Sequence, residues 1–216
     1  MSKLLCACAI AGSLAAQTLV VDRRRPPNQT PVARQVERDG KGFVGDSFKV
    51  GNTGEIWILD TIRVWALPSP SRECPKQPGD QLEKITLLGA LDNPPVPGQP
   101  ICACHALITI GSGSFAPGSA TPASPAVKFA EDGGLWRIDF ENLRWSLPGG
   151  LDVLFAVRAS GRPDTACAAG RTWALSSSAA AGEYRLFTFD KDALEDGFLE
   201  STNWINVQVW AHRSGQ

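Results

Sequence analysis

The sequence has few of the residues on which enzyme active sites commonly depend. Its 216 residues include only two histidines, His105 and His212. It has no G-x-S-x-G nucleophile turn, no H-E-x-x-H zinc motif and no G-x-x-x-x-G-K-[ST] loop that would cradle a phosphate. Four carboxylates that could serve a glycosidase gather near one expected strand: Glu131, Asp132, Asp139 and Glu141. We interpret them as a solvated loop and the outward face of a strand, and we expect no enzymatic activity.

Long apolar runs and basic blocks are also lacking. No segment after residue 16 approaches the roughly 18 apolar residues of a membrane-spanning helix, so we expect no membrane span. The 21 basic residues are balanced by 22 acidic ones. The one basic cluster, Arg23 to Arg25, stands directly before two prolines and is most simply a solvated leader. We therefore expect no nucleic-acid partner.

Residues 1–16 have the pattern of a secretory signal peptide. A single cation, Lys3, is followed by an uncharged apolar stretch that ends in small residues. The alternative is a buried N-terminal helix or strand. We predict a signal peptide over 1–16, an extended polar segment over 17–41 and a single domain over 42–213. The mature protein would then be secreted, and thus extracellular or periplasmic.

Cysteine usage agrees with an oxidising compartment. Four cysteines follow the signal: Cys74, Cys102, Cys104 and Cys167. Cys102 and Cys104 are two apart in an expected strand and face the same side, so they are poorly placed to bond each other. We expect one of them to pair with Cys74 and the other with Cys167. A metal site that uses Cys74, Cys102, Cys104 and His105 is the alternative, but C-x-C-H lacks the usual ligand spacing.

Short apolar runs separated by Gly, Pro and Asn dominate the chain, and helical patterns are nearly absent. This predicts an all-β fold, a two-sheet antiparallel β-sandwich (jelly-roll-like) with long Pro/Gly-rich loops and little helix. The stretch DKDALEDGFLES has a helical pattern and concentrates carboxylates. Asp190, Asp192 and Asp196 are candidates for a structural calcium site, although Leu194 and Glu195 break the EF-hand register. We expect no other cofactor.

Several stretches carry a resemblance to a group of secreted proteins. They are DSFKV, EIWILDTIRVW, LWRIDFENLRWSLPGGLDVLFAV and NVQVW. Over residues 43–212 the chain resembles secreted bacterial β-sandwich (jelly-roll-like) proteins. In these, a DDF strand comes first, a W-x-I-x-x-[IV]-x-[FW] strand follows, and N-x-x-[VI]-[FW] ends the domain. The resemblance implies the fold and the compartment, and it carries over no functional residue.

Two strands carry most of the tryptophans. In the last strand, alternation puts four apolar residues toward the core: Ile205, Val207, Val209 and Ala211. The opposite face then holds Trp204, Asn206, Gln208, Trp210 and His212. In EIWILDTIRVW, alternation puts Ile56, Ile58, Asp60, Ile62 and Val64 toward the core, with Trp57, Leu59, Thr61, Arg63 and Trp65 opposite. Asp60 on the core face suggests a β-bulge or a buried, hydrogen-bonded carboxylate.

Flat rings interleaved with amides suit a sugar, because rings stack on its face and amides bind its hydroxyls. The predicted ligand-binding residues are Trp204, Asn206, Gln208, Trp210, Trp57, Arg63 and Trp65. The competing interpretation is a satellite core, since tryptophan is usually buried. We expect a non-catalytic binding module whose partner is a polysaccharide or a cell-surface glycan. The alternative is a structural or adhesive protein (a surface-layer, matrix or filament subunit) that self-assembles through its N-terminal segment.

Overall fold

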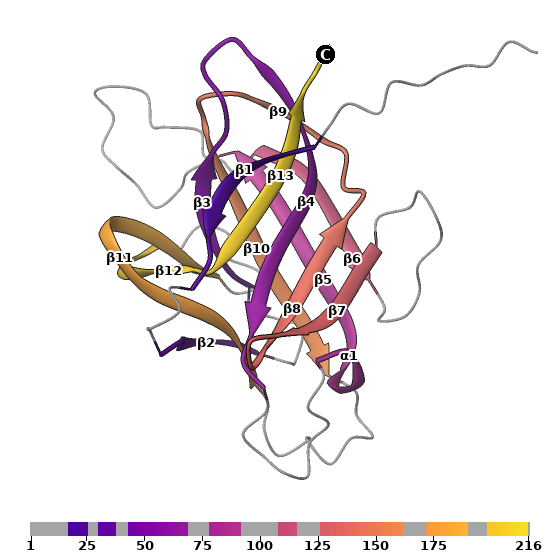
Figure 1. Cartoon of the computed structure of the whole chain (residues 1–216), viewed down its shortest axis with the longest axis vertical. Coiled ribbons are helices and arrows are strands. Elements are labelled where there is room, and N and C mark those ends of the chain that lie inside the picture. Colours follow the sequence, from indigo (N-terminus) through magenta and orange to yellow (C-terminus); the bar gives the residue numbers. More distant parts are fainter. Residues whose placement is uncertain are drawn as a thin grey trace, which may run out of the picture.

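The protein is a β-sandwich, as the sequence predicts. The computed structural model describes residues 17–25, 30–37, 43–68, 78–91, 108–115, 126–161, 172–189 and 198–215. Within these ranges the chain forms thirteen strands and one short helix, and every strand pair is antiparallel. The strands form two sheets packed face to face (Figure 1).

The sheet nearer the viewer in Figure 1, called the front sheet here, carries the candidate site. Its strands are β1 (Thr18–Arg23), β13 (Val207–Arg213), β4 (Ile56–Ala66), β8 (Leu135–Glu141), β7 (Ala126–Asp132) and β9 (Trp145–Pro148). The spatial order is β1-β13-β4-β8-β7. β9 continues the line of β8 and pairs with the first half of β4.

The second layer is the back sheet. Its strands are β12 (Phe198–Ile205), β11 (Thr172–Phe189), β3 (Phe43–Lys49), β10 (Asp152–Gly161), β5 (Leu82–Leu91) and β6 (Ile108–Phe115). The four-residue helix α1 (Pro78–Gln81) leads into β5. β11 joins the two sheets, because its Leu175 pairs with Ala66 of β4 while its end pairs with β3.

The segment 17–41, expected to be extended, contains two strands. β1 pairs with β13 at one side of the front sheet, and β2 (Val32–Glu37) pairs with the first half of β11. Val20 and Val21 of β1 pack against the main core. These strands therefore add to the chain's own sheets.

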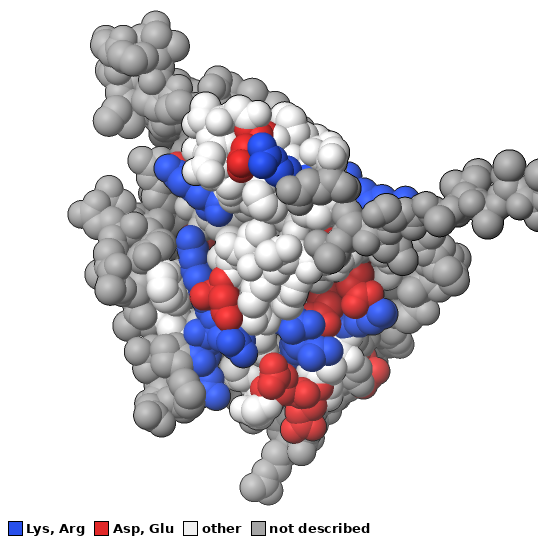
Figure 2. All heavy atoms as spheres, turned by 45° about the horizontal axis from the view of Figure 1, so that its top comes forward, with Lys and Arg blue, Asp and Glu red and all other residues white. Residues whose placement is uncertain are grey.

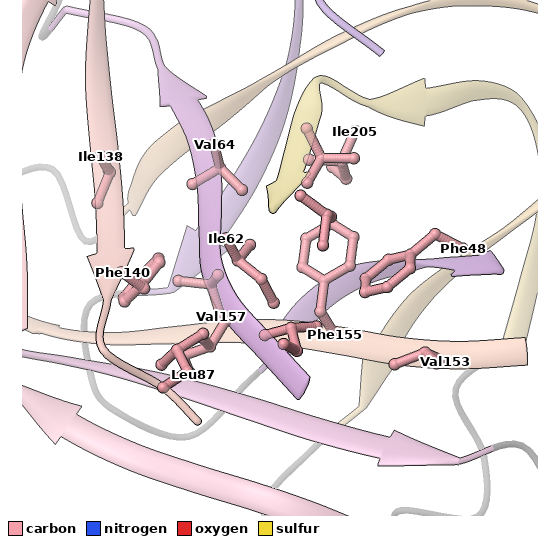
Figure 3. Packing of buried hydrophobic residues seen from close by; sticks show 14 of the residues in the cluster. Phe48, Ile62, Val64, Leu87, Ile138, Phe140, Val153, Phe155, Val157 and Ile205 are labelled. Carbon is pink, nitrogen blue, oxygen red and sulfur yellow. The ribbon is translucent and has the colours of Figure 1, made fainter. Parts of the chain in front are cut away.

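The core fills the space between the sheets (Figure 3). Ile62, Val64 and Phe140 come from the front sheet, and Phe48, Leu87 and Phe155 face them from the back sheet. The rings of Phe48 and Phe155 lie 6.0 Å apart at 37°, a tilted arrangement typical of aromatic pairs. The four predicted core residues of the last strand are fully buried: Ile205, Val207, Val209 and Ala211.

Gly45 of β3 lies so close to the backbone of β10 that a side chain has no room there. It lies opposite Ala156 of β10 on one side and Phe187 of β11 on the other. A Cβ atom at this position would stand 1.8 Å from the carbonyl oxygen of Phe155. Glycine is the residue that allows β3 to lie between these two neighbours.

Candidate functional site

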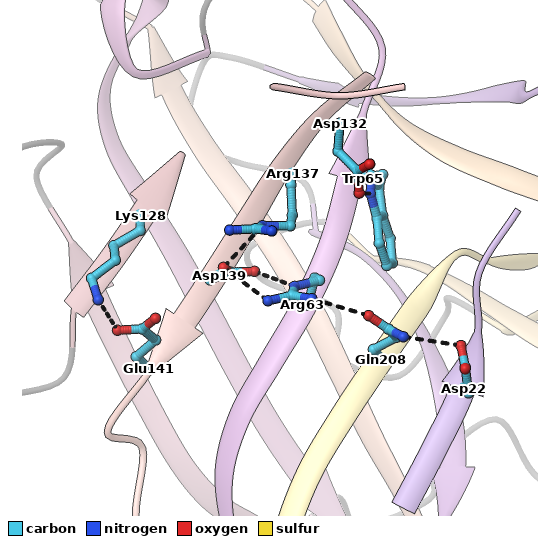
Figure 4. Close-up of polar contacts among 9 residues, drawn as sticks. All are labelled: Asp22, Arg63, Trp65, Lys128, Asp132, Arg137, Asp139, Glu141 and Gln208. Atoms are coloured by element: carbon cyan, nitrogen blue, oxygen red, sulfur yellow. Dashed lines mark hydrogen bonds and ion pairs between the residues drawn. The ribbon is translucent and has the colours of Figure 1, made fainter. Parts of the chain in front are cut away.

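A line of polar side chains crosses the outer face of the front sheet (Figure 4). Successive strand pairings place one residue of each strand directly opposite the next: Asp22, Gln208, Arg63, Asp139 and Lys128. We call these five residues the polar row. They come from β1, β13, β4, β8 and β7 in that order, so the row exists only once five distant segments are in register.

Hydrogen bonds join the middle of the polar row. Arg63 donates to Asp139 from Nε at 2.5 Å and from Nη2 at 3.2 Å, and its Nη1 donates to Gln208 Oε1 at 3.2 Å. Gln208 in turn donates from Nε2 to Asp22 Oδ1 at 3.1 Å. Hydrogen bonds from Arg24 hold the pKa of Asp22 below its usual range. Both ends of the Gln208 amide are therefore engaged.

Asp139 has more cationic neighbours than its place on an outward strand face suggests. Arg137 Nε lies 3.1 Å from its Oδ2, so two guanidinium groups share one carboxylate. Asp139 lies on the outward face of β8, as the sequence predicts, but its side chain is only 5% exposed because Arg63 and Arg137 cover it. Lys128 instead forms an ion pair with Glu141 at 2.5 Å.

Two of the predicted tryptophans lie beside the polar row. Trp210 is half-buried, and Arg63 Cζ lies 4.6 Å from its ring centroid, a cation–π contact. Trp65 is buried and donates its indole N–H to Asp132 Oδ2 at 2.9 Å. Figure 2 shows charged side chains of both signs gathered around uncharged surface. The structure thus brings Arg63, Gln208, Trp65 and Trp210 together.

Asn206, by contrast, lies inside the protein. It is fully buried, and its Oδ1 accepts from Ser176 Oγ at 2.7 Å while its Nδ2 donates to Ser178 Oγ at 2.9 Å and to the Arg23 carbonyl at 3.2 Å. At this residue the chain leaves β12 in the back sheet and enters β13 in the front sheet. A side chain at such a crossing is covered by strands of both sheets. Trp204 lies next to it, half-buried, with Arg23 Cζ 5.3 Å from its ring centroid.

Trp57 is on the opposite side of the front sheet from Trp65. The pairing of β13 with β4 skips Asp60, so β4 has a bulge there. Because of this extra residue, the side chains from Ile56 to Leu59 face the opposite way from that predicted. Leu59 is fully buried, Trp57 packs against the core and Ile56 is 48% exposed. The predicted faces are correct from Ile62 onward and wrong from Ile56 to Leu59, because alternation was carried through the bulge.

Asp60 is both bulged and hydrogen-bonded, the two alternatives that its position suggested. Its Oδ2 lies 2.7 Å from His212 Nδ1 on β13, and its carbonyl accepts from the Leu143 amide at 3.0 Å. Leu143 sits in the three-residue break between β8 and β9, where Asn142 and Arg144 have φ of 57° and 52°. Such a backbone conformation is uncommon for residues other than glycine.

A further buried carboxylate, that of Asp46, is not among the residues that the sequence pointed to. It is fully buried and accepts from the amides of Ser47 at 2.7 Å and Ile205 at 2.8 Å, with Arg23 Nη1 3.8 Å away. Burial raises the pKa of Asp46 to about 6. Strand alternation could have found it, because Asp46 shares its face with Val44 and Phe48, both core residues.

The remaining predicted sites fall outside the described residues. This holds for Cys74, Cys102, Cys104 and Cys167, for Asp190, Asp192 and Asp196, and for the signal at 1–16. Within the described ranges, no three His, Cys, Asp or Glu side chains form a group that could hold a metal ion. In the same part of the chain, no helix has the length and apolar character to span a bilayer.

Comparison with known proteins adds no relative: no protein-family model matches the sequence, and no curated protein is significantly similar to it.

Proposed function

We propose that the protein is a secreted, non-catalytic module that binds carbohydrate on the outer face of its front sheet. The observation that carries this proposal is the position of half-buried Trp210 beside the polar row. Secretion is supported by the signal-like residues 1–16 and by the even number of cysteines after them.

The groups on this face have hydrogen-bonding capacity left for a ligand. A guanidinium carries five N–H donors, and Arg63 uses three of them on Asp139 and Gln208. Two donors therefore remain. No described residue accepts from the indole N–H of Trp210. Donors beside a flat ring match a sugar, which presents hydroxyls at its edge and C–H groups on its face.

The structure narrows the set of residues that could contact such a ligand. Asn206 is enclosed between the sheets, and Trp57 is turned toward the core. Trp65 is buried, with its N–H already donated to Asp132. The proposed contact residues are Trp210, Arg63 and Arg137, with Gln208 holding Arg63 in place.

Retention of the purified protein in gels that contain dextran, laminarin, xylan or alginate tests the proposal. We expect the wild type to be slowed by at least one of them, and Trp210→Ala to abolish that retention with little loss of stability. Trp57→Ala is the matched control, since it removes an equal side chain from the core side of the same sheet. It should lower the free energy of unfolding, because Trp57 packs against the core. Its retention should equal that of the wild type.

Two results would overturn the proposal. One is a wild type that none of the four polysaccharides retains. The other is a Trp210→Ala variant that loses several kcal/mol of stability, as does the removal of a core aromatic. Concentration-dependent assembly of the wild type, lost on removal of residues 17–41, would instead favour the structural or adhesive function.

A further inference from the structure

His212 and Asp60 form a pair on the outer face of the front sheet. On β13, His212 comes four residues after Gln208 of the polar row. His212 Nδ1 lies 2.7 Å from Asp60 Oδ2, and the two side chains are 25% and 10% exposed. No described residue hydrogen bonds to the other ring nitrogen, Nε2. One nitrogen of the ring is therefore held by the protein, and the other is left for a partner.

The backbone around Asp60 fixes the orientation of this pair. The β-bulge turns the Asp60 side chain toward β13, and the Leu143 amide holds the Asp60 carbonyl at 3.0 Å. A carboxylate can only accept, so Nδ1 carries the proton. In the neutral form of the ring, Nε2 then presents an acceptor lone pair. Bulges recur where a strand must re-aim a side chain.

The pair lies in line with Trp210. His212 is two residues beyond Trp210 on β13. Both side chains point to the outer face, because the alternate residues Val209 and Ala211 are in the core. Gln208, Trp210 and His212 thus follow one line of about 13 Å, at 3.3 Å per strand residue. Two exposed apolar side chains lie on the same face. Leu19, 39% exposed, pairs with Trp210 across β1 and β13, and Ile56, 48% exposed, is two residues from Ile58, the partner of His212 on β4.

We propose that His212 is a second contact of the carbohydrate site, and that its Nε2 accepts a hydrogen bond from a sugar hydroxyl while the sugar stacks on Trp210. Asp60 is a positioning residue that sets the tautomer and the angle of the ring. This inference rests on the proposed function and deepens it. The ligand would lie along β13, with its hydroxyl-bearing edges at the polar row and at His212.

The test uses the same gels, with the polysaccharide among dextran, laminarin, xylan and alginate that retains the wild type. His212→Ala should bind the polysaccharide roughly fivefold to tenfold more weakly than the wild type, because it loses one hydrogen bond worth about 1 kcal/mol of binding free energy. His212→Gln, which keeps a polar side chain, serves if the alanine variant fails to fold. Ser146→Ala, across Ile58 from His212, is the matched control and should bind as the wild type does.

A double-mutant cycle and a spectroscopic readout separate the role of Asp60 from simple stability. Asp60→Asn should weaken binding alone, but add nothing to His212→Ala, because it acts through the ring. The ¹⁵N shifts of His212 should report the Nδ1–H tautomer in the wild type and its loss in Asp60→Asn. Equal binding by wild type, His212→Ala and His212→Gln, with retention still lost in Trp210→Ala, would overturn this inference alone. A wild type that binds none of the four would overturn the proposed function and this inference with it.

Discussion

Arg63 on β4 and Asp139 on β8 face each other across the front sheet, joined by hydrogen bonds at 2.5 and 3.2 Å. They are 76 residues apart in sequence. In this pair the guanidinium of Arg63 lies over the ring of Trp210, with its Cζ 4.6 Å from the ring centroid. The central ion pair and the proposed ligand-binding ring are thus one structural unit.

The two cations of the polar row, Arg63 and Lys128, should contribute unequally to the free energy of unfolding. Arg63→Met should lower the free energy of unfolding by about 2 kcal/mol, because Asp139 is nearly buried and loses charged hydrogen bonds. Lys128→Ala should cost less than about 0.5 kcal/mol, because the lysine is 62% exposed. Urea unfolding measures both. Equal losses in the two variants would show that the Arg63 bonds add no stability.

Asp46 should make stability depend on pH in an unusual direction. Its folded pKa is about 6, above the ordinary 3.8, so the folded state binds the proton more tightly than the unfolded state. Its contribution to stability is therefore largest in acid and is lost as pH rises from about 4 to about 6, by about 3 kcal/mol in all.

Asp46→Asn isolates this contribution, because the other carboxyls of the protein titrate in both variants. As pH rises from about 4 to about 6, the free energy of unfolding of the wild type should fall relative to that of Asp46→Asn. Above that interval the difference between the two variants should be constant. Urea unfolding between about pH 4 and pH 7 measures the difference. A difference that stays constant throughout would contradict a raised pKa.

Gly45→Ala should destabilise the protein by about 3 kcal/mol or prevent folding, because the added methyl group meets the Phe155 carbonyl and the backbone must move. Gly133→Ala is the control. Nothing lies within 4 Å of its added Cβ, and only the strain of φ +59° remains, about 1 kcal/mol. Thermal unfolding of the two variants gives the comparison. A Gly45→Ala variant as stable as Gly133→Ala would mean that β3 is not so tightly confined.

Asn206→Ala should lower the free energy of unfolding by about 2 kcal/mol and leave polysaccharide retention intact. The substitution deprives two buried serine hydroxyls, those of Ser176 and Ser178, of their partner. Unfolding in urea and retention in the gels are measured on the same preparation. Loss of retention without loss of stability would return Asn206 to the ligand-binding set.

The cysteines give a prediction that needs no structure. The mature protein should contain two disulfides, one from Cys74 and one from Cys167, each to Cys102 or Cys104. Its mass should rise by four hydrogens on reduction, and peptide mapping should give the pairing. Four free thiols in the secreted, unreduced protein would contradict the disulfides and favour the metal alternative.

Local sequence was sufficient wherever a property depends on neighbours along the chain. Short apolar runs between Gly, Pro and Asn predicted the all-β class. Alternation predicted the core face of the last strand, because successive side chains of any strand point to opposite sheet faces. The same reasoning marked Asp60 as the irregular position of β4. Alternation also places Asp46 between Val44 and Phe48 on the core face of its strand.

Tertiary structure decided what depends on distant partners. Only the pairing of β13 with β4 shows that Asp60 is skipped, and this single extra residue moves Trp57 to the core side. Only the crossing from β12 to β13 encloses Asn206, which alternation alone assigns to an outer face. The polar row needs five strands in register, and a strand's own residues do not specify which strand lies beside it or in what alignment.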